Sequence, residues 1–439
     1  MSGNVIHLPR PRAQRPAPEG LGFYVRAGRN DHVALLDLLA TGAEGIFGLV
    51  IEAQHVDRHR ELMTEARRRD LDVILDPKVL QMGFPGALTE GLAALPWGLE
   101  RHHNVTDFDG SAGQQRAAQI VETAANKGFT QLLGPTHLLS SQNDPWLRRD
   151  IAMMNRTANE IARSGAELDL VYPLAVPTRL LRNAAERRAI IAALADAPCA
   201  AIWLKVENFG DDATGEKIAA YIQACRDFHA RGLPLVGDHV GGLPGLGALA
   251  FGAVGGIAHG VTMQQSFRAS SWRRPPALGG GFGPSWRVYI PQLDLLLKTE
   301  AARMLFAASP KIRAMCGCKD THCCPRGVGD MMSHPARHAI YQRAREIEHL
   351  SAVPQSVRAN HYLNQSVRKV SDDVAQVAAF PVGDDALVKR LQAKQQEMSR
   401  YRQTVAHLVE NTEPASVAVA PSGSEERLIV AGGKRSCVG

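Results

Sequence analysis

Eight short apolar runs alternate with helical segments between residues 22 and 259, and this alternation is the strongest constraint on the fold. The runs are rich in β-branched and aromatic residues, and apolar positions between them recur at helical spacing, which is the pattern of repeated βα units. Eight buried strands in about 240 residues favour an α/β fold of the (β/α)8 TIM-barrel type over an open doubly wound sheet. The runs occupy residues 22–27, 46–51, 72–76, 129–134, 168–174, 200–206, 233–238 and 254–259.

Composition divides the rest of the chain. Residues 1–20 are basic and Pro-rich, and residues 412–439 mix Pro, Ser, Gly and Glu without a period, so we expect a flexible arm and a flexible tail. We assign residues 21–265 to the barrel, 266–375 to a basic, zinc-binding helical subdomain and 376–411 to a helical extension. Residues 77–114 are too long for one βα loop and predict an insertion. No apolar run reaches the roughly 18 residues that span a bilayer, so we expect a cytoplasmic protein without a membrane partner.

Polar residues stand at the carboxyl ends of the predicted strands, where the loops of a barrel build its active site. Carboxylates beside histidines can perform nucleophilic or acid–base catalysis. The alternative is that these residues cap loops and pair with one another. Gly241 and Gly242 follow the seventh strand and would let backbone N–H groups approach an anion or a flat base, although tight barrel corners also require glycine. The strand-end set is Arg26, Glu52, Asp76, Thr136, His137, Tyr172, Lys205, Glu207, Asp238, His239 and His259.

Four of the seven cysteines lie within nine residues, as Cys316, Cys318, Cys323 and Cys324. Such clustering is typical of a metal site rather than of disulfides. A Cys-x-Cys pair can place two thiolates on one metal, and a third Cys nearly completes a tetrahedral site, so we expect zinc. The alternative is a set of reduced thiols or a redox role. The fourth ligand stays open between Cys324 and a downstream histidine, which could be His334, His338, His349 or His361.

Residues 266–319 are strongly basic, with nine Lys and Arg against two acidic residues. Trp272, Phe282, Trp286 and Tyr289 are interleaved with these cations. Cations among aromatic side chains favour phosphate contacts with base stacking, although a solvated surface is the alternative. We expect Arg268, Arg273 and Arg274 to contact a nucleic acid.

The later part of the chain resembles the tRNA-guanine transglycosylase superfamily, including its DNA-acting 7-deazaguanine branch. The resemblance extends over residues 22–370 and is carried by AFGAVGGIAHGV, CGCKDTHCC, HAIYQRAREIEHL and NHYLNQSV. It implies a barrel with a zinc subdomain, His361 as the favoured fourth ligand, dimerisation through that subdomain, and exchange of guanine for a 7-deazaguanine-type base in nucleic acid.

Two departures from the family pattern bear on the site. Four residues separate Cys318 from Cys323 where the family has two, and His259 stands where the family has its nucleophilic aspartate. What the family chemistry requires is a carboxylate that attacks the ribose and a second group that manages protons. We therefore predict Asp238 as the nucleophile with His259 assisting and Asp76 as the acid–base or base-reading group. Substrate contacts are expected from Arg26, Glu52, Lys205 and Glu207 together with the glycines and arginines named above.

The sequence leaves alternative functions. The favoured one is a base-exchange enzyme that acts on DNA rather than tRNA, because the chain departs from the pattern of the tRNA enzymes. The second is a non-catalytic, zinc-containing barrel that binds nucleic acid as a subunit of a larger assembly. The third is a barrel enzyme for small molecules. A homodimer and accessory protein subunits are both compatible with the first two.

Overall fold

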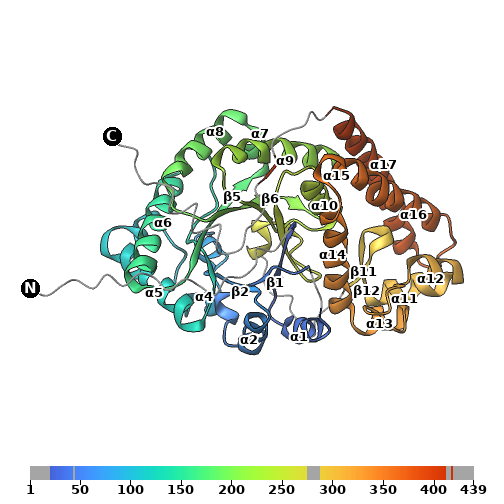
Figure 1. Ribbon diagram of the computed structural model, residues 1–439, viewed down its shortest axis with the longest axis horizontal. Coiled ribbons are helices and arrows are strands. Elements are labelled where there is room, and N and C mark those ends of the chain that lie inside the picture. Colours follow the sequence, from blue (N-terminus) through green and yellow to red (C-terminus); the bar gives the residue numbers. More distant parts are fainter. Residues whose placement is uncertain (1–19, 43–44, 274–286, 412–416, 419–439) are drawn as a thin grey trace, which may run out of the picture.

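The computed structural model describes residues 20–42, 45–273, 287–411 and 417–418. Its centre is a closed parallel barrel of eight strands, as predicted (Figure 1). Two short strands, β7 (Phe209–Gly210) and β10 (Ser266–Phe267), extend the sheet beside the sixth barrel strand. The barrel strands are β1 (Gly22–Ala27), β2 (Gly48–Glu52), β3 (Asp72–Asp76), β4 (Gln131–Leu133), β5 (Asp169–Pro177), β6 (Ala201–Glu207), β8 (Leu235–Asp238) and β9 (Gly256–Gly260).

A ring of helices covers the outside of the barrel (Figure 1). Each helix buries an apolar face against the strands, and the outward-facing strand residues belong to the main hydrophobic core with them. The helices that follow the first seven barrel strands are α1 (His32–Ala40), α2 (Arg60–Arg68), α5 (Gly110–Lys127), α6 (Pro145–Ser164), α7 (Thr178–Arg182) with α8 (Ala184–Ala193), α9 (Gly215–Phe228) and α10 (Gly242–Ala250).

The barrel interior is a separate apolar layer, because successive residues of a strand point to opposite faces. Two residues after the interior-layer residue of each strand, the next inward-facing position lies at the carboxyl-terminal mouth of the barrel. On five strands this position carries a charge: Arg26, Glu52, Asp76, Lys205 and Asp238. On β9 it is Gly260. The interior layer consists of Tyr24, Val50, Ile74, Leu133, Val171, Trp203, Val236 and Ala258.

The predicted insertion after β3 is present. It holds two short helices, α3 (Val79–Met82) and α4 (Glu90–Ala93), and a 3-10 turn at Val105–Phe108. Trp97 is buried and anchors the insertion, since its indole N–H donates to the Pro77 carbonyl at 2.9 Å. The insertion therefore forms a fixed wall of the barrel mouth.

The region after β9 leaves the barrel and then returns to it. A hairpin of β11 (Arg287–Ile290) and β12 (Leu295–Lys298) leads into α11 (Thr299–Ala308), α12 (Pro310–Cys316) and α13 (Val328–Ser333). The next helix, α14 (Pro335–Ser351), packs against α1, α10 and β1. Figure 1 shows α14 between α1 and α10, so it occupies the place of the eighth outer helix. The Cys-rich segment is thus an insertion in the last βα unit.

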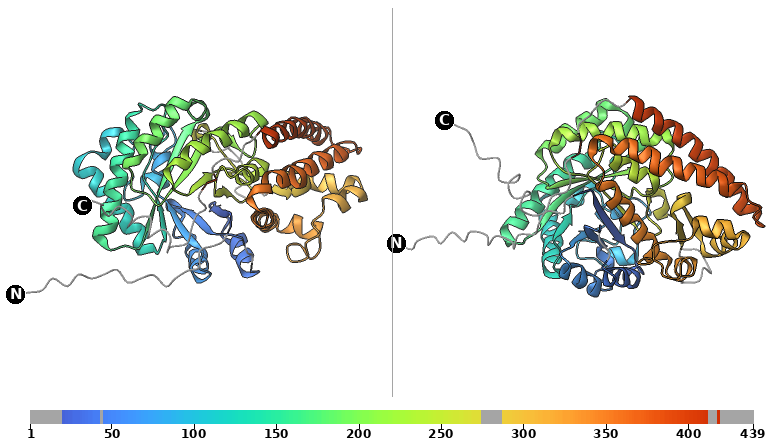
Figure 2. Two further views of the ribbon diagram at one scale, coloured as in Figure 1. Left: turned by 45° about the horizontal axis from the view of Figure 1, so that its top comes forward. Right: turned by 45° about the vertical axis from the view of Figure 1, so that its right-hand side comes forward.

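Two long helical segments complete the described chain. Helix α15 (Gln355–His361) continues through a π-helical turn at Tyr362–Arg368 into α16 (Lys369–Ala378), and α17 (Asp385–Asn411) lies beside α16 and α9. Figure 2 shows α16 and α17 side by side. No helix in the described part of the chain combines the length and apolarity needed to cross a bilayer. The predicted arm up to residue 19, nearly all of the predicted tail, and Arg274 lie outside the described residues.

Candidate functional site

Arg26 lies at the centre of the barrel mouth between two aspartates. Its Nε and Nη2 atoms donate to the two oxygens of Asp238 at 2.6 and 2.8 Å, and its Nη1 donates to Asp76 Oδ2 at 2.8 Å. The guanidinium is buried, with 1% of the side chain exposed. These three residues come from β1, β3 and β8, so the pairing joins strands from across the barrel.

Three further charged residues extend the contacts of Arg26 with the two aspartates into a network. Lys205 Nζ lies 3.2 Å from Asp238 Oδ2, and Lys78 Nζ lies 3.1 Å from Glu52 Oε1. We call the six residues Arg26, Glu52, Asp76, Lys78, Lys205 and Asp238 the mouth network. It contains three cations and three carboxylates, so its formal charges cancel. Many strand-end residues at the mouth therefore pair with one another, which was the alternative to a catalytic role.

The mouth network keeps both aspartates ionised. Burial is the largest single effect and raises the pKa of each carboxyl, but the charges and hydrogen bonds of Arg26 and the neighbouring cations together outweigh it, so both pKa values lie well below the usual range. Lys205 also lowers both, as Lys78 does for Asp76. Asp238 is fully enclosed, with 0% of its side chain exposed against 12% for Asp76. A carboxylate with no exposed surface is poorly placed to attack a substrate. The structure therefore favours Asp238 as the residue that orients Arg26, and not as a nucleophile.

His259 does not belong to the mouth, contrary to the sequence-based prediction. Its neighbour on β9, Ala258, faces the barrel interior, so the His259 side chain points to the opposite, outer face of the strand. Its ring lies 5.0 Å from that of Phe23 in the outer core, and its Nδ1 contacts the Gly260 carbonyl at 2.8 Å. Burial lowers the pKa of His259 to about 3. Position along the strand was predicted correctly, but the face of the strand was not.

Aromatic side chains cover the mouth network. Phe267 and Trp272, from the segment after β9, have ring centroids 5.4 Å apart, and Trp272 meets Phe84 of the insertion at 5.6 Å. Lys205 lies 5.4 Å from the Phe267 ring and Lys78 lies 5.8 Å from the Trp272 ring. Both lysine side chains are largely buried, with 7% of Lys205 and 11% of Lys78 exposed, so the rings lie over the lysine side of the network.

Other predicted substrate contacts are engaged within the protein. Arg268 forms an ion pair with Asp212, and Arg273 donates to the Pro85 carbonyl at 3.0 Å while lying over Phe84. The Gly241 N–H donates to the Gln265 carbonyl at 2.9 Å. Gly242 has a positive φ of 62°, which a tight corner at the start of α10 requires. The glycines therefore fit the alternative of a barrel corner.

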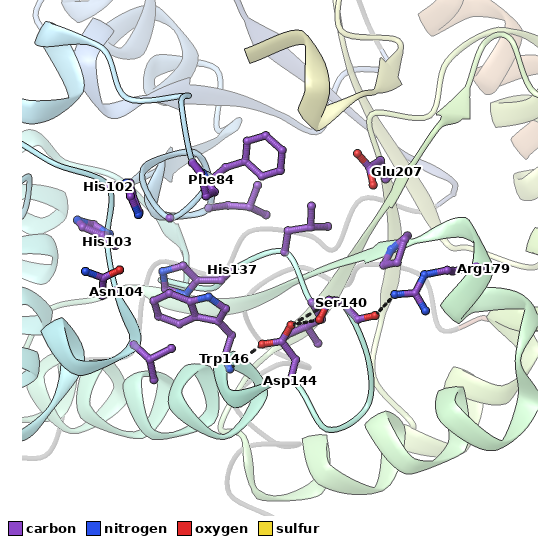
Figure 3. Close-up of a pocket in the computed structure, with 17 residues that line it drawn as sticks. Phe84, His102, His103, Asn104, His137, Ser140, Asp144, Trp146, Arg179 and Glu207 are labelled. Carbon is purple, nitrogen blue, oxygen red and sulfur yellow. Dashed lines mark hydrogen bonds between the residues drawn. The ribbon is translucent and has the colours of Figure 1, made fainter. Parts of the chain in front are cut away.

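A pocket of about 500 Å³ lies beside the covered mouth, between the insertion and the ends of β4, β5 and β6. Figure 3 shows His137 lying flat against Trp146, with Glu207 and Arg179 across the pocket. Glu207 was predicted as a substrate contact and His137 as a strand-end residue, and both line the pocket. Trp146 and Arg179 were missed, because they belong to helices and carry no short motif.

A second site lies in the insertion of the last βα unit. The ligand atoms of Cys318, Cys323, Cys324 and His338 all lie within 4.8 Å of one another. The His338 Nδ1 atom is 3.3 Å from Cys323 Sγ and 3.4 Å from Cys324 Sγ. Ligand atoms of a tetrahedral zinc site with Zn–S bonds near 2.3 Å are separated by about 3.5–3.8 Å, so this set could hold a metal ion and is compatible with zinc.

The surroundings of this cluster also fit a metal. His338 Nε2 lies 3.0 Å from the Tyr289 carbonyl, a contact that would leave Nδ1 free to bind metal. Asp320 holds the intervening turn, since its Oδ1 accepts from the Cys323 N–H at 3.2 Å. Four protein ligands leave no open position, so a metal here would stabilise the fold rather than activate a substrate.

Two of the predicted ligands lie outside this group. Cys316 ends α12 inside the hydrophobic core, where burial raises its pKa to about 12. His361 follows the far end of α14 and lines a different pocket with Glu346. His338 is in the first turn of α14, which follows the Cys segment and α13, and this helix start brings it to the thiolates. His338 was one of several histidines in range, and distance along the chain could not select it.

Comparisons with known proteins add little. No protein-family model and no curated protein matches the chain. Several solved structures match weakly. A 3-dehydroquinate dehydratase from Enterococcus faecalis is 9% identical over 59% of this chain and 94% of its own, with a TM-score of 0.33. A thermostable xylanase mutant from Cellvibrio japonicus is 14% identical over 55% and 86%, with a TM-score of 0.34. A carboxyl transferase domain of Rhizobium etli pyruvate carboxylase is 12% identical over 89% and 63%, with a TM-score of 0.36. Scores this low say nothing about function.

Replacing Arg26 with Met tests the mouth network. Arg26→Met leaves two buried carboxylates without their main partner, so we expect a loss of about 3–5 kcal/mol in the free energy of unfolding, measured by urea titration. The matched control is Arg68→Met, because Arg68 pairs with Glu65 on the exposed face of α2 and should matter little. Equal effects of the two substitutions would contradict the network's structural role.

The metal cluster predicts which residues bind metal. Cys323→Ala and His338→Ala should lose bound metal and lower the melting temperature, because each removes one of four ligands. Cys316→Ala and His361→Ala are the matched controls and should retain metal. Elemental analysis of each purified variant, together with melting in the presence of a chelator, makes the measurement. Loss of metal from His361→Ala with retention in His338→Ala would restore the assignment based on sequence.

Proposed function

We propose that the protein is a base-exchange enzyme that replaces guanine in nucleic acid with a 7-deazaguanine-type base. Support comes from a (β/α)8 barrel whose last unit contains a Cys₃His cluster, the combination that the family resemblance implies. We favour DNA over tRNA because the chain departs from the pattern of the tRNA enzymes. Zinc in this proposal maintains the last βα unit.

Asp76 is the residue that we assign to covalent catalysis. The observation that carries this assignment is an ionised carboxylate at the mouth that is less enclosed than Asp238. Asp76 Oδ2 accepts from Arg26 and Oδ1 accepts from the Lys78 N–H at 2.9 Å, which holds the carboxylate in one orientation. Each oxygen keeps a second lone pair with which it could attack.

The reaction would proceed in two displacements. An Asp76 oxygen forms a bond to the anomeric carbon of the sugar as the bond from that carbon to guanine breaks, and the leaving nitrogen receives the electron pair and a proton. The incoming base then loses a proton and displaces Asp76. Asp238 keeps Arg26 against Asp76 throughout. Three flat side chains lie at the mouth, Phe84, Phe267 and Trp272. Once these rings move apart, they could stack on nucleotides.

The pairing of charges at the mouth favours a second function. Three cations and three carboxylates that neutralise one another, beneath aromatic side chains, resemble a structural core more than an open active site. The protein would then be a non-catalytic barrel that binds nucleic acid within a larger assembly. Salt-dependent binding without base exchange distinguishes this function.

The Asp76→Asn variant tests the proposed enzyme. The purified protein is incubated with duplex DNA and, separately, with tRNA in the presence of a labelled 7-deazaguanine base. We expect wild-type protein to incorporate label and Asp76→Asn to do so roughly 10³-fold more slowly or less, because the amide is a poor nucleophile. Without added base, a covalent complex with the polymer should survive denaturation for wild type only.

The matched control is Asp196→Asn, the same chemical change at an exposed residue directly before β6, at the opposite end of the barrel. Its activity should equal that of wild type. Full activity of a folded Asp76→Asn variant would exclude Asp76 as the nucleophile. Binding of the polymer that weakens with salt, without incorporation or trapping by the wild type, would instead support the non-catalytic barrel.

A further inference from the structure

His137 and Asp150 form a buried pair at the edge of the pocket of about 500 Å³. The His137 Nδ1 atom lies 2.7 Å from Asp150 Oδ1, and the backbone N–H of the same histidine donates to Asp150 Oδ2 at 2.8 Å. Asp150 belongs to α6, which begins shortly after His137. One carboxylate therefore holds both the backbone and the ring of His137 in a single orientation.

This geometry sets the state of the ring. Because an ionised Asp150 can only accept, the neutral imidazole carries its proton on Nδ1 and presents a lone pair on Nε2. His137 Nε2 is buried and has no hydrogen-bond partner among the residues that the structure describes. A buried nitrogen without a partner is unfavourable, and a ligand in the pocket could supply one.

The walls around His137 suit a flat ligand. Its ring stacks on Trp146 with centroids 3.5 Å apart and planes at 14°. Gly83 stands against the free edge, where a Cβ atom would lie 2.3 Å from His137 Cδ2 and 3.0 Å from Nε2. Glycine at this position keeps a side chain away from that edge. Phe84, Glu207 and Arg179 add one aromatic and two charged groups to the lining.

The buried ionisable neighbours of His137 are less suited to proton transfer than His137 itself. His103 lies 6.4 Å away across the same aromatic cluster, and burial lowers its pKa to about 3, so it stays neutral near neutral pH. Burial raises the pKa of Asp150, and the contact with His137 offsets part of this effect. Tyr172, on β5, has its pKa raised well above the usual value by burial and remains protonated.

We propose that the pocket binds the planar base and that His137, oriented by Asp150, transfers the base's ring proton. This inference rests on the proposed base exchange. The His137 imidazolium donates a proton to the nitrogen of the departing guanine, which has taken the electron pair of the broken bond. The resulting imidazole then takes the ring proton of the incoming base as that nitrogen bonds to the anomeric carbon. The histidine ends in its starting state, so the cycle needs no further acid or base. Asp150 is a positioning residue.

Three variants test the dyad through catalysis. His137→Gln keeps a polar side chain but cannot exchange protons at neutral pH, so we expect exchange to fall by about 10²–10⁴-fold and to lose the pH dependence that the histidine causes. Asp150→Asn should give a smaller loss with an altered pH profile, and Asp150→Glu should recover part of it. The matched control is His59→Gln, since His59 is also buried but lies with His32 and His55, outside this pocket. It should retain wild-type exchange.

Binding of the free base separates this proposal from the proposed function. Titration of wild-type protein with 7-deazaguanine should quench tryptophan fluorescence, and Trp146→Phe should lose most of that signal. His137→Gln should weaken binding at least about tenfold, the effect of losing a hydrogen bond to the ligand's polar group. If His137→Gln weakens binding of the free base but the wild-type protein exchanges no base, the pocket is upheld and base exchange is overturned. Binding and pH-dependent exchange unchanged in a folded His137→Gln variant would overturn the dyad.

Discussion

The structure depends on the complete pairing of one buried guanidinium. Removing Arg26, Asp76 and Asp238 from water is costly, and this cost is offset only when every charge has a partner at hydrogen-bonding distance. The three residues come from three different strands, so the pairing holds only in the native register of the closed barrel. The polar layer above the apolar interior thus makes the strand arrangement specific, and any chemistry at the mouth must use charges that already stabilise the fold.

This constraint limits what each carboxylate can do. Asp238 accepts from Arg26 on both oxygens and is enclosed, so its effect on a substrate would pass through Arg26. Asp76 also accepts from Arg26, but it lies at the more exposed edge of the mouth network. The pocket beside the mouth offers the features that the network lacks: open volume, a flat aromatic wall and a histidine nitrogen that has no partner among the described residues. The proposed reaction therefore places covalent catalysis at the mouth and proton transfer in the pocket.

The metal cluster and the barrel are joined through α14. This helix closes the outer ring between α1 and α10, and its first turn carries His338. The same histidine contacts the Tyr289 carbonyl in the β11 hairpin strand. A metal bound to His338 and the three cysteines would therefore fix the inserted segment and the start of the last barrel helix together. Loss of metal is expected to weaken the closure of the barrel and not only the insertion.

The sequence by itself determined the elements and their order. Eight apolar runs separated by amphipathic segments can bury their surface as a closed βα barrel, and clustered cysteines indicate metal, because both signals come from residues near one another in the chain. Only the tertiary structure decided which face of β9 carries His259, which of several histidines joins the cysteines, and that Asp150 on α6 orients His137. These outcomes depend on strand parity and on contacts between separate elements. Short-range patterns do not encode such contacts, since many residues lie within reach along the chain and packing selects among them.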